Sequence, residues 1–520
     1  MVSAESSDPV IASIIANDKT PWYKKPNLRF LYIFLVPCCL AIEATGGFDS
    51  SMMNGLQSLK YWQKAFNHPD GAILGMLSAS YSLGAITALP FVAILSDHVG
   101  RRWAIMFGSL VMMAGAVLQC FSVNSKFTMW IFARIFLGHG FPYCVVSGSS
   151  LIGELAHPKE RARLGSLFNA FYFVGALLAA GITLQTLKIK SDWSWKLPSI
   201  LQMAPSVLQV TFIFFIPESP RWLLSKDRGE EALAILKKYH DEAGEEFAIA
   251  EIEFAQIKKA LEVENESRKR GWAELFQSPG MRRRSLIGAF LGLFTQFSGN
   301  TLISAYLVVI LKQIGFTNPF VQNQINVGLQ GWNLVVAFCL ALFVSRFPRR
   351  RMYLLCASCL LCVYTGWTIA QARQMITGSY AAGITVIAFI FLYQLAYSIG
   401  YNALTYVYLV EIFPYFVRTK GISWFQLFGK GAGFFSTFVN PIALKDITWR
   451  YLIVYIVWLA FEICFIYFLF PETHNRSLEE LAFLFEPQEE KDAISGGLEK
   501  RHLEDDVHIE VLGKQNDDKV

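Results

Sequence analysis

Charged side chains are scarce in this chain. Asp, Glu, Lys and Arg make up 17% of its 520 residues, whereas hydrophobic residues make up 53%. A soluble domain carries about 25% charged residues, so the composition argues against a soluble protein and predicts a membrane protein. The net charge of +5 says little by itself, and we expect no nucleic-acid partner.

Cysteine chemistry is missing as well. All nine cysteines fall within predicted membrane spans, where they serve as small packing residues. Cys356-x-x-Cys359-x-x-Cys362 has the spacing of a metal site, but it lies in an apolar stretch with no His nearby. We therefore expect neither disulfides nor a bound metal.

Signatures of enzymes and of ATP-driven pumps are also absent from the sequence. Gly429-Lys430-Gly431-Ala432-Gly433 superficially suggests a phosphate-binding loop, but it lacks the Gly-x-x-x-x-Gly-Lys-Ser/Thr spacing. Close helix packing by small residues is the expected role of this run. No nucleophile–base set is found, so we expect neither catalysis nor a cofactor. The polar first 28 residues contain no cleavable secretory signal.

The sequence contains many long apolar stretches, and these predict transmembrane helices. A helix needs roughly 20 apolar residues to cross a membrane, and we find twelve stretches of about this length. They lie near residues 30–49, 71–95, 103–123, 128–148, 165–186, 199–216, 285–311, 321–344, 352–372, 381–410, 421–443 and 451–470. The predicted fold class is an all-α membrane protein with twelve transmembrane helices.

Three short motifs occur twice, about 250 residues apart, which indicates two homologous six-helix halves with a substrate site between them. The pairs are Asp97-His-Val-Gly-Arg101-Arg102 with Ser345-Arg346-Phe-Pro-Arg349-Arg350, Glu154 and Arg161 with Glu411 and Arg418, and Pro217-Glu218-Ser with Pro471-Glu472-Thr.

Lys and Arg concentrate in the loops that are cytosolic if both termini are cytosolic, which predicts that orientation. The glycosylation triplets at Asn265 and Asn475 fall on the same side. The predicted parts are an N-terminal tail (1–28), a first half (29–216), a loop with amphipathic helices (217–284), a second half (285–473) and a C-terminal tail (474–520). The loop helices are expected to join the two halves.

Acid–base pairs at neighbouring helix ends can hold one face of a carrier closed, because parting them leaves partly desolvated charges unpaired. Simple positive-inside anchoring is the alternative for the arginines. The candidate gate residues are Asp97, Arg101, Arg102, Glu154, Arg161, Glu218 and Arg221 in the first half, and Arg346, Arg349, Arg350, Glu411, Arg418 and Glu472 in the second.

These motifs resemble the sugar porter family of the major facilitator superfamily over about residues 29–485. The resemblance is carried by Asp97-x-x-Gly-Arg-Arg, Arg134-x-x-x-Gly-x-Gly, Pro217-Glu-Ser-Pro-Arg221-Trp, Gln296-Phe-Ser-Gly and Pro471-Glu-Thr-x-x-Arg-Ser-Leu-Glu-Glu. Asn300 and the stretch Gly400-Tyr-Asn-Ala resemble the fungal lactose permease and cellodextrin permease branch, with hexose transporters as further relatives. The chain departs from the family pattern in span 10, where Gly400-Tyr-Asn-Ala replaces Gly-Pro-Gly-Pro.

A sugar is neutral and rich in hydroxyl groups, so its site needs uncharged donors and acceptors and an aromatic platform. The resemblance implies that Gln296, Thr301, Asn333 and Tyr406 line the central sugar site and that Asn169 takes the place of a glutamine in span 5. It also implies that spans 1, 4, 7 and 10 line the cavity, which favours the residues in spans 7 and 10. The candidate substrate residues are Asn169, Gln202, Gln296, Asn300, Thr301, Asn333, Asn402 and Tyr406. Hydrogen bonding between helices is the alternative role for any single amide.

Ionisable residues inside spans are costly and usually functional. By resemblance, Asp49 matches the acid of span 1 that takes a proton in family symporters, and Arg134 is its partner in span 4. Opening that salt bridge would let Asp49 take up a proton. Glu43, about 9 Å along the helix from Asp49, is either a second proton site or a vestibule residue.

The sequence therefore predicts a monomeric sugar transporter of the plasma membrane that works by alternating access, surrounded by membrane lipid. We expect proton-coupled uptake of a disaccharide of the lactose or cellobiose type, or of a hexose. A facilitative hexose carrier, a non-transporting sugar sensor and an exporter of other metabolites are the alternatives.

Overall fold

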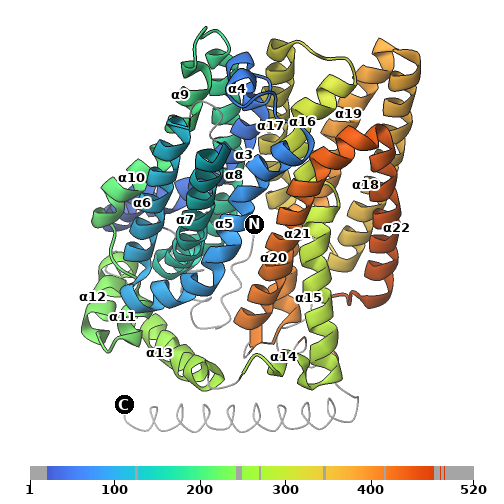
Figure 1. The fold of residues 1–520 in the computed structure, drawn as a ribbon. Helices are drawn as coiled ribbons and strands as arrows, with labels where there is room; N and C mark the ends of the chain where they lie inside the picture. The colour runs from blue at the N-terminus through green and yellow to red at the C-terminus, as the bar shows by residue number, and fades with distance from the viewer. Residues whose placement is uncertain are drawn as a thin grey trace, which may run out of the picture.

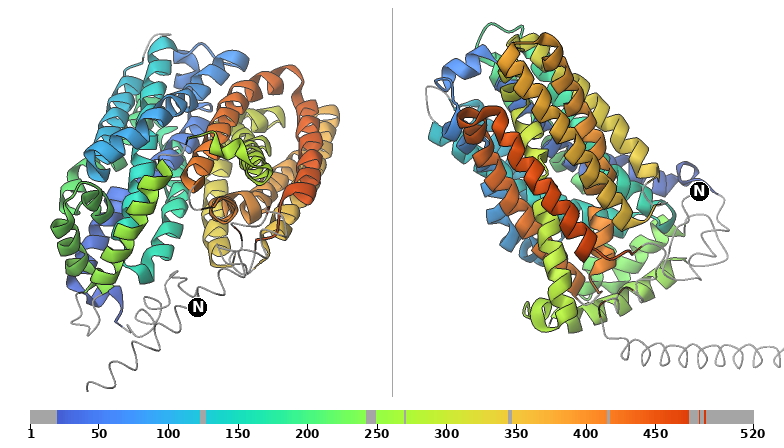
Figure 2. Two further views of the ribbon diagram at one scale, coloured as in Figure 1. Left: turned by 90° about the horizontal axis from the view of Figure 1, so that it is seen from below. Right: turned by 90° about the vertical axis from the view of Figure 1, so that its right-hand side faces the viewer.

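The structure is a computed structural model that describes residues 20–122, 127–241, 249–268, 271–343, 347–414, 417–473, 481 and 485. These residues form helices and no strands. Figure 1 shows the helices running side by side in one bundle, and Figure 2 shows the blue-to-green and yellow-to-red portions lying next to each other.

The first half contains six spans. They are α2 (Pro26–Leu35) continued by α3 (Ala41–Leu56), α5 (Gly71–Val99), α6 (Arg101–Cys120), α7 (Phe127–Leu155), α8 (Pro158–Thr186), and α9 (Trp193–Leu201) continued by α10 (Ala204–Phe212). A wide π-helical turn, Val36–Leu40, joins α2 to α3.

The second half repeats this plan. Its spans are α15 (Pro279–Phe297) continued by α16 (Asn300–Gln313), α17 (Pro319–Phe343), α18 (Arg349–Thr377), α19 (Tyr380–Tyr397) continued by α20 (Thr405–Ile412), α21 (Arg418–Asp446) and α22 (Tyr451–Leu469). All twelve predicted spans are confirmed, and most helices extend a few residues beyond the predicted apolar stretch.

Ten of the twelve spans are apolar enough to be identified as membrane helices from composition, and the other two are α17 and α21. These two helices carry buried amides and hydroxyls, among them Asn326, Gln330, Ser436 and Asn440. Each packs against a helix of the first half, α17 against α8 and α21 against α5. Their polarity is tolerated because protein, and not lipid, surrounds much of their surface.

Short helices cover one end of the bundle (Figure 1), which we call the motif end because the repeated motifs lie there. They are α11 (Pro220–Ser225), α12 (Gly229–His240), α13 (Ile249–Arg268) and α14 (Glu274–Gln277). Helix α13 is tied to the first half by Arg161–Glu253 at 3.0 Å, and α14 approaches the second half through Lys420–Glu274 at 4.0 Å.

Hydrogen bonds join the two halves at the opposite end, which we call the far end. Helix α16 is kinked at Tyr306 (φ −130°, ψ 21°), and Asn54 of α3 binds backbone groups on both sides of the kink. The Asn54 amide donates to the Ser304 carbonyl, and its Oδ1 accepts from the Leu307 N–H at 3.0 Å. A second contact joins the halves at this end: Lys445 of α21 pairs with Asp70, the residue before α5, at 2.8 Å.

Candidate functional site

The motif Gln296-Phe-Ser-Gly299 breaks span 7. Gly299 has φ +100° and ψ 8°, and a Cβ atom there would lie 1.7 Å from the Tyr364 hydroxyl, so the break requires glycine. The break ends α15 and begins α16, which places three candidate substrate residues together. Thr301 Oγ1 donates to Gln296 Oε1 at 3.2 Å, and Asn300 is half-buried beside them.

Span 10 is also interrupted, although it has no proline. A π-helical turn, Ser398–Asn402, separates α19 from α20, so a wide backbone turn replaces the proline hinge that relatives would suggest. Asn402, the last residue of this turn, and Tyr406 beyond it are both exposed. Gln426 of α21 donates to the Tyr406 hydroxyl at 2.6 Å, and the Phe425 ring packs edge-on at 5.9 Å.

Asn333 lies at one end of a ladder of amides on α17. Asn333 donates to Gln330 at 3.3 Å, Gln330 donates to Asn326 at 3.3 Å, and Asn326 donates to Ser51 of α3 at 3.3 Å. The ladder leads from the candidate sugar site to the other half. Sequence reasoning selected only Asn333, although residues 326, 330 and 333 have the spacing of a single helix face.

The remaining two candidate substrate residues lie apart from this group. Asn169 is exposed on α8, the helix that packs against α17. Gln202 lies between α9 and α10 and is 1% exposed, and neither of its amide atoms has a hydrogen-bond partner among the described residues. In the described part of the chain, no hydrogen bond joins either residue to Gln296 or Tyr406.

Asp49 and Arg134 form a buried ion pair, the pairing that the resemblance implied. Arg134 of α7 donates to the Asp49 carboxylate of α3, and the two side chains are 4% and 8% exposed. Arg134 also donates to the Ser78 carbonyl at 3.4 Å and lies 5.2 Å from the centre of the Tyr81 ring. The pair therefore connects spans 1, 2 and 4 within the first half.

Glu43 is not part of this pair. It is half-buried on α3, and it interacts electrostatically with Lys430 of α21 in the other half. A further acid inside the membrane, Glu462 of α22, is fully buried and accepts a hydrogen bond from Tyr401 at 2.7 Å. Sequence reasoning passed over Glu462, although an acid within a strongly apolar span is itself a signal of function; its partner, Tyr401, could not be predicted from the sequence.

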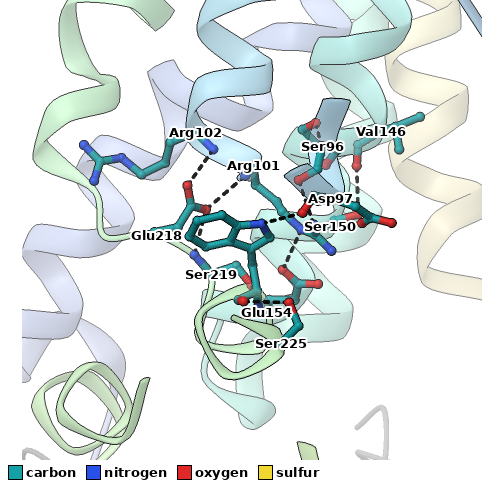
Figure 3. Close-up of polar contacts among 12 residues, drawn as sticks. Ser96, Asp97, Arg101, Arg102, Val146, Ser150, Glu154, Glu218, Ser219 and Ser225 are labelled. Atoms are coloured by element: carbon teal, nitrogen blue, oxygen red, sulfur yellow. Dashed lines mark hydrogen bonds and ion pairs between the residues drawn. The ribbon is translucent and has the colours of Figure 1, made fainter. Parts of the chain in front are cut away.

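At the motif end of the first half, Glu218 caps helix α6 (Figure 3). Its carboxylate accepts from the N–H groups of Arg101 at 3.1 Å, Arg102 at 3.2 Å and Ser219 at 2.9 Å. A carboxylate is favourable at a helix N-terminus, where N–H groups lack partners. Burial raises the pKa of Glu218, although these backbone hydrogen bonds oppose the rise.

Gly100 makes that cap possible. It has φ +101° and ψ 165°, a conformation that is essentially restricted to glycine. A Cβ atom at this position would lie 2.5 Å from Glu218 Oε2. The glycine of the first motif is therefore explained by the close approach of a carboxylate.

The Arg101 side chain extends the network to span 4. It pairs with Asp97 at 3.2 Å and with Glu154 at 3.6 Å. The Trp222 indole N–H donates to the Asp97 carbonyl at 3.0 Å, which ties the Pro217-Glu-Ser-Pro-Arg-Trp motif to the end of α5. Arg221, beside Trp222 on α11, is half-buried.

The second half builds a related network. Glu472 accepts from the Arg349 N–H at 2.8 Å, at the start of α18, and from the Thr473 N–H at 3.1 Å. The Arg349 side chain pairs with Glu411 at 3.2 Å, and Thr473 donates to the same carboxylate at 2.5 Å. The preceding residue is Pro348, with an ordinary φ of −59°.

The other gate residues occupy equivalent places in the two halves. Arg161 donates to the Ala156 carbonyl at 3.3 Å, and Arg418 donates to the Phe413 carbonyl at 3.3 Å, in each case five residues back. Arg102 donates to the Ile213 carbonyl, and Arg350 donates to the Tyr467 carbonyl. Arg346 lies outside the described residues.

Comparison with known proteins identifies the family to which the chain belongs. The sequence profile of the sugar (and other) transporter family matches residues 36–485. The chain belongs to this family. It is therefore a multi-pass membrane protein and a sugar transporter of the sugar porter group.

The low-affinity glucose transporter HXT1 of Saccharomyces cerevisiae is 25% identical over 480 residues, which cover 89% of this chain and 83% of the yeast protein. The MFS-type transporter criB of Aspergillus cristatus is 25% identical, over 87% of this chain and 94% of its own. The inward-open xylose transporter XylE from E. coli superposes with a TM-score of 0.73 at 21% identity, over 88% of this chain and all of that one. This likeness supports the twelve-helix fold.

Proposed function

We propose that this sugar transporter couples uptake to protons at the plasma membrane and carries a disaccharide of the lactose or cellobiose type, or a hexose. The observation that carries the proposal is the buried ion pair between Asp49 and Arg134. Two unlike charges held without water form a site that a proton can switch, because protonation of Asp49 removes its attraction to Arg134.

The energetics suit accumulation. A membrane potential of about 100 mV contributes about 2.3 kcal/mol per proton, and one pH unit adds about 1.4 kcal/mol. Together they support roughly a 500-fold sugar gradient with one proton per sugar. The alternative is a facilitative carrier in which the same ion pair has only a structural role.

The sugar site proposed here lies at the breaks of spans 7 and 10. Gln296, Asn300 and Thr301 provide donors and acceptors at the first break, Asn402 and Tyr406 at the second, and Asn333 ends the amide ladder. Tyr406 offers a ring face against which a sugar can stack. Asn169 and Gln202 remain candidates, although no hydrogen bond among the described residues joins them to this group.

Alternating access follows from the two ends of the bundle. Arginines crowd the motif end, so we place that end and both termini in the cytosol by the positive-inside rule. The far-end contacts of Asn54 and Lys445 then close the extracellular side. In this proposal the motif networks clamp each half internally, and the halves rock against one another.

The test is uptake of labelled lactose, cellobiose and glucose into transporter-null yeast, with a pH electrode in the medium. Sugar-dependent alkalinisation that disappears in Asp49→Asn is the expected result. Asp192→Asn, a change at an exposed aspartate at the start of α9, is the matched control and should behave like wild type. Uptake that only equilibrates, with no pH change, would make the protein a facilitator.

A further inference from the structure

Lys430 is a basic residue inside the bundle that neither the ion pair nor the motif networks use. On α21, Gln426, Lys430 and Gly433 follow one another at spacings of four and three, so they lie on one face of the helix. Gln426 donates to the Tyr406 hydroxyl at 2.6 Å, and a Cβ atom at Gly433 would lie 3.5 Å from Gln296 Oε1. Lys430 therefore lies between two residues of the candidate sugar site.

Glu43 faces this position from the other half. It precedes Asn54 by eleven residues of α3, which brings the two side chains within about 20° of each other around the helix axis. Asn54 contacts α16 of the second half, so Glu43 lies on the same inward face. Its charge interacts with Lys430 and with Tyr406. An acid and a base thus oppose each other across the boundary between the halves.

The two charges are separated, in contrast to Asp49 and Arg134. Both side chains are half-buried, and within the described part of the chain neither makes a hydrogen bond or an ion pair within 4 Å. A charged donor and a charged acceptor are therefore available to a ligand between the halves. A sugar hydroxyl can donate and accept at once, which suits such a pair.

We propose that Glu43 and Lys430 bind the sugar directly, with Lys430 donating to one hydroxyl group and Glu43 accepting from another, so that the bound sugar bridges the two halves. The proposal rests on the proposed function and names the substrate class as a neutral polyhydroxylated ring. The pair gives an anionic sugar no net advantage over a neutral one, because repulsion by Glu43 offsets attraction by Lys430. Hydrogen bonds to charged groups are the stronger kind, so these two residues contribute to affinity and to the choice of hydroxyl pattern.

The experiment measures uptake of labelled glucose, lactose and cellobiose by wild type, Lys430→Gln and Glu43→Gln in transporter-null yeast, corrected for the amount of protein at the surface. Singly deoxygenated glucose analogues then serve as competitors. Lys188→Gln, an exposed lysine beyond α8, is the matched control. We expect each site variant to raise KM by about 10- to 100-fold, the effect of losing one charged hydrogen bond.

The analogues separate binding from a structural role. In wild type, the analogue that lacks the hydroxyl bound by Lys430 should compete about 10- to 100-fold more weakly than glucose. In Lys430→Gln that difference should disappear, while the other analogues keep their ranking, and Glu43→Gln should do the same for a different hydroxyl. A structural defect would instead weaken the competition by all analogues to the same extent.

Equal weakening of all analogues, or an unchanged KM in both variants, overturns this proposal and leaves the proposed function standing. If glucuronate competes with labelled sugar for uptake by wild type more strongly than glucose does, the neutral substrate class is overturned. Failure of wild type to take up any of the three labelled sugars overturns the proposed function, and this proposal with it.

Discussion

The two halves of the molecule build their motif ends from the same parts with different local geometry. In both halves a carboxylate from the segment after the sixth span binds the first N–H of the third span, and an arginine at that position pairs with a glutamate of the fourth span. Among the described residues, the first half adds a second helix N–H to the cap, and it has a glycine, Gly100, where the second half has Pro348. The two halves of an internal repeat can therefore keep the same electrostatic contacts while the backbone conformation that supports them differs.

The largest effect should come from changing the residue before the third span of the first half, and the equivalent change in the second half should have little effect. Gly100→Ala places a side chain in a glycine-only conformation and against Glu218, and we expect a loss of about 3 kcal/mol. Pro348→Ala changes a residue with an ordinary φ and should stay within about 0.5 kcal/mol of wild type. Thermal unfolding of the purified chains in one detergent compares them, and equal midpoints would contradict the asymmetry.

Removing the capping charges should give an intermediate effect. Among the described residues, Glu218 accepts from three backbone N–H groups and Glu472 from two. We expect Glu218→Gln to cost about 2 kcal/mol and Glu472→Gln about 1 kcal/mol. Thermal midpoints again give the order. The reverse order would show that the caps are not what distinguishes the two halves.

The Glu218 cap should also make the stability of the protein depend on pH. Burial raises the pKa of Glu218, so the folded chain holds this proton more tightly than the unfolded chain. The contribution of Glu218 to stability therefore falls as pH rises from the ordinary glutamate value of about 4.3 through the raised value. Glu218→Gln should flatten this part of the curve of thermal midpoint against pH, and a curve that keeps the wild-type slope in Glu218→Gln would contradict the assignment to Glu218.

The smallest effect should distinguish Arg161 from Arg418. Arg161 also pairs with Glu253 of α13, which His240 contacts as well. Burial alone would raise the pKa of Glu253, but His240 and Arg161 hold it below its ordinary value, so its charge supports docking at neutral pH and is lost only in acid. Arg161→Gln should increase hydrogen exchange in α12 and α13 at pH 7, and Arg418→Gln should leave it unchanged.

The sequence predicted the twelve spans because apolar length is a local property of the chain. It also identified the charged motif residues, whose spacing recurs in both halves. It did not predict the partners: Glu218 binds backbone N–H groups more than a hundred residues away, and nothing in its neighbourhood identifies them. The division into tails, loop and halves remains a prediction, as do the roles of the site and gate residues.

Interior polarity was only partly predicted. Asn333 was selected, but Asn326 and Gln330 on the same face of α17 were not, because the site was sought residue by residue. Asn54 and Glu462 were missed for a different reason. Their importance depends on the α16 kink and on Tyr401, and both of these are consequences of packing between distant spans.

The Asn54 contact has a mechanical consequence. Asn54, a residue of the first half, satisfies the backbone groups at the kink in α16. The shape of this helix in the second half therefore depends on a side chain from the first half. Backbone groups without partners cost several kcal/mol inside a membrane. The far end therefore cannot separate while α16 keeps its present bend: the helix must rewind as Asn54 withdraws, and parting of the halves and straightening of α16 become a single event.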